Sequence, residues 1–356
     1  MSDNLFQRLL KERPYLVADG AMGTNLFKRG LESGDAPELW NVDHPDRIES
    51  IHQEFIDAGA DIVLTNSFGG NAYRLKLHNA QDRTYELAKA AAEIARRVAD
   101  KTDRPIVVAG SMGPTGELFE PVGELSFEDG KAAFAEQARG LKDGGADALW
   151  IETMSSREEA AAAVAGAAEA GLPVVTTMTF DTVGKTMMGI APDEAYRHLS
   201  TLPIAPAAIG ANCGLGATEN VLSIRAMSDA VGPDVAVVAK ANCGVPEYRA
   251  GGFVYTGTPE LMADYARLAR DCGARIIGGC CGTDGTVLKA IAEALKGYEP
   301  GEKPSVEVIV EKLGPLAGVT DRPAHGHGHG HGHGGGDGDG EDGEDGGRRR
   351  GRRRRG

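Results

Sequence analysis

Short apolar runs alternate along this chain with longer segments in which apolar residues recur every three or four positions. Runs such as PIVVAG (105–110) and VAVVAK (235–240) contain no alternating polar positions except the final Lys. This pattern is typical of parallel strands that are covered on their outer face. We therefore expect eight strands, at residues 15–19, 61–66, 105–110, 147–152, 173–180, 207–212, 235–241 and 274–279.

The segments between these runs have helical periodicity. Ile48, Ile51 and Phe55 fall on one helical face, and so do the sets 134/138/141, 261/265/268/272 and 288/291/295. Ser126 with Asp129, and Ser155 with Glu158, resemble capping boxes and predict helix starts. The tetrapeptides AGAD (58–61), GGAD (144–147) and CGAR (272–275) each predict a helix that ends at Gly before a strand begins.

Eight strand–helix units predict an α/β protein with a (β/α)8 TIM barrel, which we assign to residues 1–315. The alternative is a doubly wound open sheet. The chain has no G-x-G-x-x-G after a strand with an acidic residue about 20 positions on, and no Walker A motif. The segment most similar to a phosphate-binding loop, GSMGPTG (110–116), is a poor match because Pro114 lacks a backbone N–H donor. The barrel is the favoured prediction.

The composition changes abruptly near Ala324, where a His-Gly repeat is followed by acidic-Gly and Arg-rich stretches. We assign residues 316–356 to a disordered tail, since the stretch beyond Ala324 has no apolar side chains to bury. Five of the nine histidines alternate with Gly between 325 and 333. Solubilising low complexity is the favoured interpretation, and loose metal storage or delivery is the alternative.

Length and charge exclude several classes of protein. The chain has 356 residues and a net charge of −14, which argues against a nucleic-acid binder with a broad basic face. It lacks an apolar run of the length that spans a membrane, and its N-terminus lacks the apolar core of a signal peptide, so we expect a cytoplasmic protein. Five cysteines are too few for a disulfide scaffold, and we expect reduced thiols.

Chemically distinctive residues stand where the predicted strands end. They are Asp19, Gly20, Asn66, Ser111, Glu152, Asn212, Cys213, Asn242, Cys243, Cys280 and Cys281. Active sites of TIM barrels lie at the carboxyl ends of the strands, so these residues are expected to converge there.

Three of these residues suit a metal. The sixth and eighth strands of a barrel flank the seventh, so their tips lie about 10 Å apart and Cys213 can meet Cys280 and Cys281. Three thiolates suit Zn²⁺ and leave a fourth position open, as in catalytic zinc sites. An incoming thiol would lose its proton there, which favours alkyl transfer to sulfur. Cys272, on an apolar helical stripe, is predicted to pack as a small hydrophobe.

The chain contains five distinctive motifs, VADGAMGTNL (17–26), LTNSFGGNAYRL (64–75), IETM (151–154), GANCG (210–214) and IIGGCCGT (276–283). They resemble those of the zinc-dependent homocysteine S-methyltransferases, a family that includes betaine enzymes and the homocysteine module of cobalamin-dependent methionine synthase. The resemblance covers about residues 10–300. It implies a (β/α)8 barrel that forms methionine by attack of a zinc-bound homocysteine thiolate on a methyl donor.

The resemblance also implies roles for individual residues. Cys213, Cys280 and Cys281 match the zinc ligands, and Asp19, Gly20 and Glu152 match positions that hold the amino-acid end of homocysteine. A carboxylate such as Glu152 suits the ammonium, and backbone N–H groups near Gly20 suit the carboxylate. The alternative for the two acidic residues is a role as rim charges or helix caps. We add Asn66 and Asn212 as substrate-binding candidates.

The methyl donor stays open at this point. Betaine enzymes cradle a quaternary ammonium with aromatic residues, one of them directly after the strand-four glutamate, where this chain has Thr153. Trp40 and Tyr73 are candidates for such a cage, although neither aligns cleanly. PELWNVDHP (37–45) and the DGAMGTNL and TNSFGGN segments resemble methionine synthase more closely. Without a D-x-H-x-x-G signature, methylcobalamin would have to arrive on a separate corrinoid protein. S-methylmethionine is a third donor.

Cys243 departs from the family pattern, because it stands at the end of the seventh strand where the family has a small residue. It is a candidate accessory ligand that fills the open zinc position, and a spectator thiol is the alternative. Two readings without enzymatic activity also stay open, namely a metal reservoir and a homocysteine-binding subunit that is silent without partners. The sequence leaves a homo-oligomer open.

Overall fold

The computed structural model describes residues 4–181, 183–230, 235–249 and 252–317. From residue 318 on, the tail that we expect to be disordered lies outside the described residues. Eight parallel strands form one sheet in the order β1-β10-β7-β6-β5-β4-β3-β2. They are β1 (Leu16–Val17), β2 (Ile62–Leu64), β3 (Val107–Met112), β4 (Ala148–Met154), β5 (Val174–Met178), β6 (Ala208–Cys213), β7 (Ala236–Ala241) and β10 (Ala274–Gly279).

The two ends of this sheet meet at β1 and β2. Ala18 forms a parallel bridge with Ile62. Two backbone hydrogen bonds support the closure, from Asp19 N to Ile62 O at 3.0 Å and from Asp61 N to Val17 O at 2.7 Å. The predicted (β/α)8 barrel is therefore confirmed, and each of the eight predicted strands overlaps an observed one.

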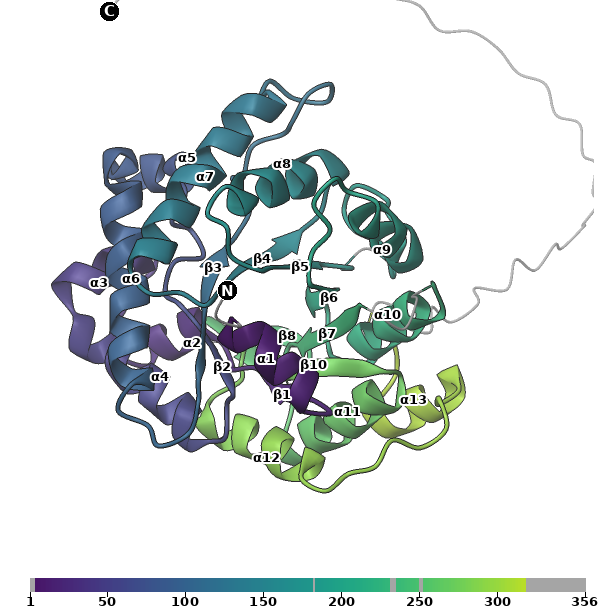
Figure 1. Cartoon of the computed structure of the whole chain (residues 1–356). Helices are drawn as coiled ribbons and strands as arrows, with labels where there is room; N and C mark the ends of the chain where they lie inside the picture. Colours follow the sequence, from purple (N-terminus) through teal and green to yellow (C-terminus); the bar gives the residue numbers. More distant parts are fainter. Residues whose placement is uncertain (1–3, 182, 231–234, 250–251, 318–356) are drawn as a thin grey trace, which may run out of the picture. The chain divides into compact units, whose positions relative to one another are not determined.

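Helices surround the ring of strands (Figure 1). They are α1 (Leu5–Glu12), α2 (Met22–Phe27), α3 (Trp40–Asp43), α4 (Pro45–Asp57), α5 (Ala72–Leu75), α6 (Thr84–Ala99), α7 (Phe127–Asp143), α8 (Arg157–Ala168), α9 (Pro192–Ser200), α10 (Ala217–Ala230), α11 (Pro259–Asp271), α12 (Gly285–Leu295) and α13 (Val306–Leu313). Within the described ranges, none of them combines the length and apolarity needed to cross a bilayer.

The apolar core has two layers. An inner cluster fills the barrel with strand residues such as Trp150, Val175 and Ile276, and Phe6 and Leu9 of α1 belong to it. Helix α1 therefore covers one end of the barrel (Figure 1). A larger cluster lies between the sheet and the outer helices. It contains the predicted helical stripes, which confirms their orientation toward the strands.

The helix–Gly–strand joints also form as predicted. Gly59, Gly145 and Gly273 have φ values of 111°, 99° and 95°, a left-handed conformation that favours Gly directly after a helix. Ser126 caps α7 through the Asp129 N–H, as expected. The second predicted cap is displaced by one residue, because Ser156, rather than Ser155, accepts the N–H of Glu159 at the start of α8.

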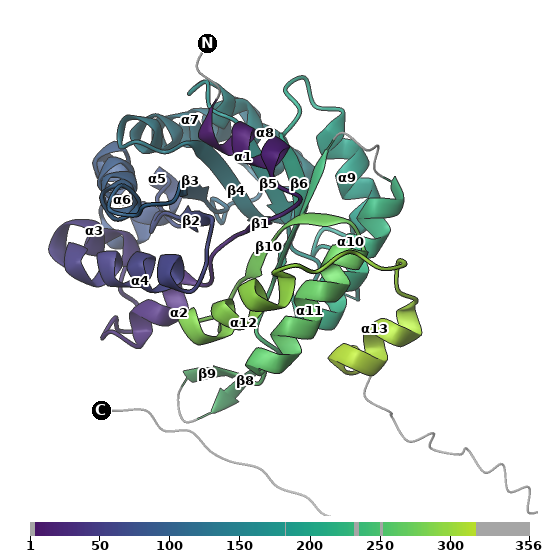
Figure 2. The ribbon, with the colours of Figure 1, turned by 60° about the horizontal axis from the view of Figure 1, so that its bottom comes forward.

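One feature escaped the sequence interpretation. Between β7 and α11 the chain forms an antiparallel hairpin, β8 (Pro246–Arg249) and β9 (Gly252–Tyr255). It lies at the end of the barrel opposite α1 (Figure 2). Its Gly- and Pro-containing sequence lacks the long apolar alternation that marks a strand in isolation. The hairpin matters because it carries Tyr255 to the cysteine loops described next.

Candidate active site

A cavity of about 350 Å³ opens at the carboxyl ends of the barrel strands. Its lining includes residues from most of these strand ends, among them Asp19, Gly20, Asn66, Ser111, Glu152, Cys213, Lys240, Cys280 and Cys281. The structure therefore brings together most of the predicted site residues. Asn212 and Cys243 do not line the cavity, although both lie next to residues that do.

Three thiols form one corner of the cavity, which we call the sulfur cluster: Cys213, Cys280 and Cys281. Cys213 ends β6, and the vicinal pair directly follows β10. Their sulfur atoms all lie within 4.8 Å of one another, and each residue is half-buried. The sulfur of Cys243 is not part of this cluster. Cys243 and Cys272 are instead buried in the apolar layer behind the strands.

The thiols of the cluster hold their protons tightly. A hydrogen bond with the Cys280 thiol lowers the pKa of Cys213, but a hydrogen bond with Cys281 and burial outweigh it and raise that pKa to about 12. The pKa of Cys281 is also raised to about 12, since the favourable contact with Cys213 is outweighed by the bond with Cys280 and by burial. Three neighbouring thiols of this kind ionise only beside a cation, which is the property of a soft-metal site.

Two asparagines fix the loops that carry the thiols. The Asn242 side chain accepts the Cys281 N–H at 3.0 Å and donates to the Gly214 carbonyl at 2.7 Å. It thus joins the end of β6 to the loop after β10 across the tip of β7, where it stands. Asn212 accepts the Thr153 N–H at 2.8 Å and donates to Thr153 Oγ1 at 2.7 Å. It links β6 to β4.

The backbone is strained at two of these positions. Cys213 and Thr153 have φ values of 60° and 64°, a left-handed conformation that costs a residue other than Gly about 1–3 kcal/mol. The hydrogen bonds between Asn212 and Thr153 and between Asn242 and Gly214 hold these two turns in place. Such strain clusters at functional sites, and here it orients the last residue of β6 and the residue after Glu152.

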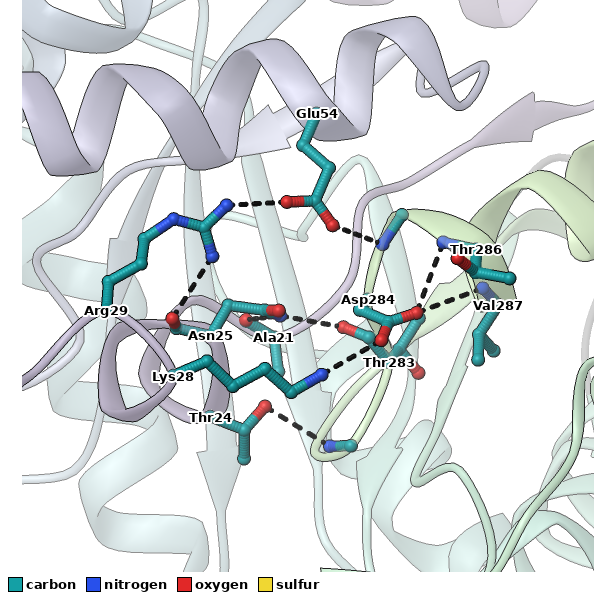
Figure 3. A network of polar contacts seen from close by, with 12 residues as sticks. Ala21, Thr24, Asn25, Lys28, Arg29, Glu54, Thr283, Asp284, Thr286 and Val287 are labelled. Atoms are coloured by element: carbon teal, nitrogen blue, oxygen red, sulfur yellow. Dashed lines mark hydrogen bonds and ion pairs between the residues drawn. The ribbon is translucent and has the colours of Figure 1, made fainter.

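The loop after β10 is anchored to α2 and α4 by a polar network (Figure 3). Thr24 Oγ1 accepts the Gly282 N–H at 3.3 Å, and Lys28 pairs with Asp284 at 2.9 Å. Glu54 of α4 accepts the Gly285 N–H at 2.8 Å and pairs with Arg29 at 2.6 Å. The vicinal cysteines therefore stand on a loop that is held on both sides.

The cavity is also lined by what we call the acidic pair, Asp19 and Glu152, and by Lys240, which interacts with both of them. Lys240 Nζ is 2.7 Å from Asp19 Oδ1, and both side chains are about 2 % exposed. The second Asp19 oxygen accepts the Leu64 N–H at 2.7 Å. Burial lowers the pKa of Lys240, but the carboxylates of Asp19 and Glu152 outweigh it and raise the net pKa above its ordinary value, so the ammonium stays charged.

Glu152 has weaker internal partners. Ser111 Oγ donates to Oε1 at 2.5 Å, and Asn212 Nδ2 lies 3.4 Å from Oε2. Burial raises the pKa of Glu152, and Lys240 opposes this effect. With both carboxyl groups ionised, the acidic pair and Lys240 together would carry a net charge of −1 beside the cavity. A cationic ligand group would complete the charge balance.

Gly20 and Asn66 occupy the cavity wall. A Cβ at Gly20 would lie 2.6 Å from the Thr283 carbonyl oxygen and 2.8 Å from the Phe55 ring, so this turn requires Gly. The Asn66 amide donates to the Pro37 carbonyl at 2.7 Å and to Asn41 Oδ1 at 3.0 Å. Asn66 therefore uses its side chain to hold the 37–41 segment.

The predicted aromatic cage does not line this cavity. Trp40 is buried, with the Arg47 guanidinium 4.6 Å from its ring centroid and the His44 ring at its edge. Tyr73 packs partly buried against the outer core layer. Among the described residues of the lining, Phe68 is the one benzenoid ring.

Sequence reasoning missed Lys240, Tyr255 and the partner roles of Ser111 and Asn242. Lys240 did carry a signal, because it is the one charge in the apolar run VAVVAK. A lysine in a strand covered on both faces needs an anionic partner, and that partner was already a candidate in Asp19. Tyr255 had no such signal, since only the hairpin brings it near Cys281.

A parallel barrel that brings three thiols and a buried acidic pair to the carboxyl ends of its strands has the arrangement of a barrel enzyme. The model of the homocysteine S-methyltransferase family matches residues 16–295. The methionine synthases of Mycobacterium tuberculosis and Mycobacterium leprae are each 34 % identical to this chain, over 317 and 310 residues. These matches cover 84 % and 82 % of this chain but 26 % and 25 % of the relatives, so the chain spans about a quarter of their length.

The fold has a solved counterpart. The metallated form of the homocysteine methyltransferase MmuM from Escherichia coli superimposes with a TM-score of 0.67 at 24 % identity, covering 82 % of this chain and 99 % of that one. At this identity the likeness supports the fold. The family match covers most of the barrel, and the chain belongs to the homocysteine S-methyltransferase family.

Proposed function

We propose that this protein is a zinc-dependent homocysteine S-methyltransferase that forms methionine. The three sulfur atoms within 4.8 Å of one another and the buried acidic pair line one cavity, and this juxtaposition carries the proposal. A metal held by the sulfur cluster would bind a thiol, and the acidic pair suits an ammonium. Homocysteine carries both groups on one short chain, together with a carboxylate.

The donor set fits Zn²⁺. Three cysteine sulfurs supply three soft ligands and leave a fourth coordination position, which is the composition of catalytic zinc sites. The raised pKa values of Cys213 and Cys281 describe the cluster without a cation, and metal binding would expel these protons. When bound, zinc would accept the substrate thiol and lower its pKa so that it reacts as a thiolate.

The acidic pair positions the other end of the substrate. In the proposed complex Glu152 receives the homocysteine ammonium, and the backbone beside Gly20 receives the carboxylate. Ser111 and Asn212 hold the Glu152 carboxylate in place, and Lys240 neutralises Asp19 so that one negative charge faces the ligand. Fixing the substrate at both ends reduces the entropic cost of reaching the reactive geometry.

The methyl transfer follows from this arrangement. The homocysteine sulfur forms a bond to the donor methyl carbon, the bond between that carbon and the donor breaks, and its electron pair leaves with the donor. The product is a neutral thioether. Because a thioether is a weaker metal ligand than a thiolate, the product is released more readily than the substrate.

For the donor we propose methylcobalamin carried by a separate corrinoid protein, which would make this chain one component of a divided methionine synthase. Two observations support this choice. The loops after β3 and β5, at the cavity end of the barrel, expose the apolar side chains of Leu118, Val122, Met187 and Met188. The cavity also lacks, in its described lining, the stacked aromatic rings that would hold betaine.

The test is methionine formation by the zinc-loaded protein with homocysteine and one donor at a time. We expect turnover with methylcobalamin and none with betaine or S-methylmethionine. Turnover with betaine or S-methylmethionine would show that this compound, and not a corrinoid, is the donor. The proposed methyltransferase activity would stand. If the protein binds zinc and homocysteine but gives no turnover with any donor, including a methylated corrinoid protein, the proposed enzymatic activity is rejected. The protein would then be a homocysteine-binding subunit.

A further inference from the structure

The cavity continues beyond the sulfur cluster and the acidic pair. We call this continuation the outer subsite, and it is lined by Glu38, Phe68, Gly69, Arg74 and His78. These residues come from the segment before α3, from the loop after β2, from α5 and from the short 3-10 helix that follows α5. The proposed complex assigns none of them to homocysteine. The outer subsite is therefore the part of the cavity that is left for the methyl donor.

Glu38 is a buried carboxyl group in the wall of this subsite. It is 5 % exposed, and its Oε1 accepts the Gly69 N–H at 2.6 Å. A Cβ at Gly69 would lie 3.0 Å from this Oε1, so a side chain there would crowd the carboxyl group. Within the described ranges Glu38 forms no ion pair. Burial raises the pKa of Glu38, and an N–H group of a ligand would stabilise its ionised form.

Arg74 places a cation at the same subsite. Its side chain is exposed and reaches the loop after β3, where a Cβ at Gly116 would lie 3.2 Å from Nη1. Among the residues that the structure describes, Arg74 also forms no ion pair. Phe68 adds an apolar wall, since it is 39 % exposed and a Cβ at Gly113 would lie 2.6 Å from its ring. The outer subsite thus combines an acceptor, a cation and a flat apolar surface.

This combination suits a ligand that has both N–H groups and an acceptor oxygen. A carboxylate accepts N–H groups, and a guanidinium donates to oxygen. The carboxamide side chains at the rim of a corrin carry both functions on one group. An amino-acid donor such as S-methylmethionine carries them as an ammonium and a carboxylate. Betaine has the oxygen atoms but no N–H.

We propose that Glu38 and Arg74 bind the part of the methyl donor that is not transferred, with Glu38 accepting its N–H groups and Arg74 donating to its oxygen. This inference rests on the proposed function and adds a second binding site in the same cavity. The methyl group would point toward the sulfur cluster, because the proposed complex places homocysteine between that cluster and Glu152. Donor recognition and homocysteine recognition would then use different residues.

Glu38→Gln tests the inference, because it keeps the shape of the side chain and an oxygen for the Gly69 N–H. It replaces the other oxygen by an NH2 group, which cannot accept a hydrogen bond. Equilibrium dialysis of the zinc-loaded full chain without homocysteine measures the dissociation constants of methylcobalamin and of S-methylmethionine. We expect methylcobalamin to bind the unchanged protein and to bind Glu38→Gln about tenfold more weakly, as for the loss of one hydrogen bond to a charged group. Homocysteine affinity and zinc content should stay unchanged.

Arg74→Gln distinguishes the two sources of the ligand chemistry. It should weaken the binding of either donor several-fold. For the carboxylate of S-methylmethionine this loss should shrink as the salt concentration rises, because salt screens the attraction between two exposed charges. For the neutral carboxamide of methylcobalamin the loss should depend less on salt. Binding of S-methylmethionine in place of methylcobalamin, with the same loss in Glu38→Gln, would support the subsite and replace the donor.

The matched control is Glu32→Gln, because Glu32 is an exposed glutamate of the same segment that does not line the cavity. It should leave donor binding unchanged. Equal donor affinity in Glu38→Gln and the unchanged protein overturns the inference and leaves the proposed function intact. So does a parallel loss of homocysteine affinity or zinc in Glu38→Gln, since Glu38 would then maintain the cavity as a whole.

Failure of both donors to bind the unchanged protein also overturns the inference, because the outer subsite would then hold no free donor. The proposed function is tested separately by the zinc and homocysteine measurements on the same samples. An unchanged protein that binds neither zinc nor homocysteine rejects the proposed function itself.

Discussion

The two sides of the cavity differ in how complete they are. On the acidic side Asp19 is bonded to Lys240 and to the Leu64 N–H, and Glu152 is bonded to Ser111. On the sulfur side the three thiols mainly contact one another, and the pKa of Cys213 is raised to about 12. The acidic side is thus held in place by partners within the fold, whereas the sulfur side takes its reactive state only with a cation. Ligand recognition and ligand activation are therefore separate properties here, and substitutions should separate them.

The largest effect is expected at the sulfur cluster. Cys280→Ala removes one of three ligands from the proposed metal, so we expect loss of both bound zinc and methionine formation. Homocysteine would lose its thiol contact but keep its contacts at the acidic pair. Zinc content and turnover are measured together. Cys272→Ala serves as the control, since Cys272 is buried in the outer core layer. Retained zinc in Cys280→Ala would remove this cysteine from the metal site.

The pH dependence of metal binding should be steep on the sulfur side. Because the pKa values of Cys213 and Cys281 are raised to about 12 without metal, the thiols are protonated at neutral pH and zinc must displace these protons. Zinc affinity should therefore rise with pH and fall as pH falls, by up to about three decades per pH unit for three thiols. Competition with a chelator across the neutral range, about pH 6 to 8, measures the slope of this dependence. A flat profile would mean that the thiols are already ionised.

Lys240→Met is expected to reduce the free energy of unfolding by about 3–5 kcal/mol, because it leaves the Asp19 carboxylate buried without its cation. Urea denaturation of the metal-free protein measures this loss. The double variant Lys240→Met/Asp19→Asn should recover much of it, since position 19 then carries no unpaired buried charge. Without that recovery, the loss would reflect packing around the lysine stem rather than the ion pair.

Glu152→Gln should affect binding more than folding. It removes the charge that faces the cavity while keeping the shape of the side chain, and hydrogen bonds to charged groups contribute about 1.5–3 kcal/mol. We therefore expect homocysteine affinity to fall by about one to two decades with zinc content unchanged. Calorimetric titration of the zinc-loaded protein measures it. Unchanged affinity would place the ammonium elsewhere, and lost zinc would show that the two sides are coupled through Asn212.

Much of this protein could be predicted from its sequence because the signals are local. Apolar runs and helical stripes indicate the eight strand–helix units, and positive-φ Gly residues mark the joints at Gly59, Gly145 and Gly273. The order of strands in a barrel then places Cys213 near Cys280 and Cys281 without knowledge of any side-chain contact. The hairpin was missed because its pairing depends on the loop around it rather than on an apolar pattern.

The sequence by itself determined the fold class, the end of the barrel that holds the site, and the residue types that meet there. Tertiary structure decided the partners and the position of each of these side chains. Asp19, which follows β1, is paired with Lys240 of β7, a strand two places away in the barrel and 221 positions away in sequence. Cys243 lies behind its strand and outside the sulfur cluster, and Tyr255 is brought to Cys281 by a hairpin. These outcomes depend on which face of a strand a side chain occupies and on distances of a few ångströms. Such quantities are fixed by packing between segments distant in sequence, which no local pattern records.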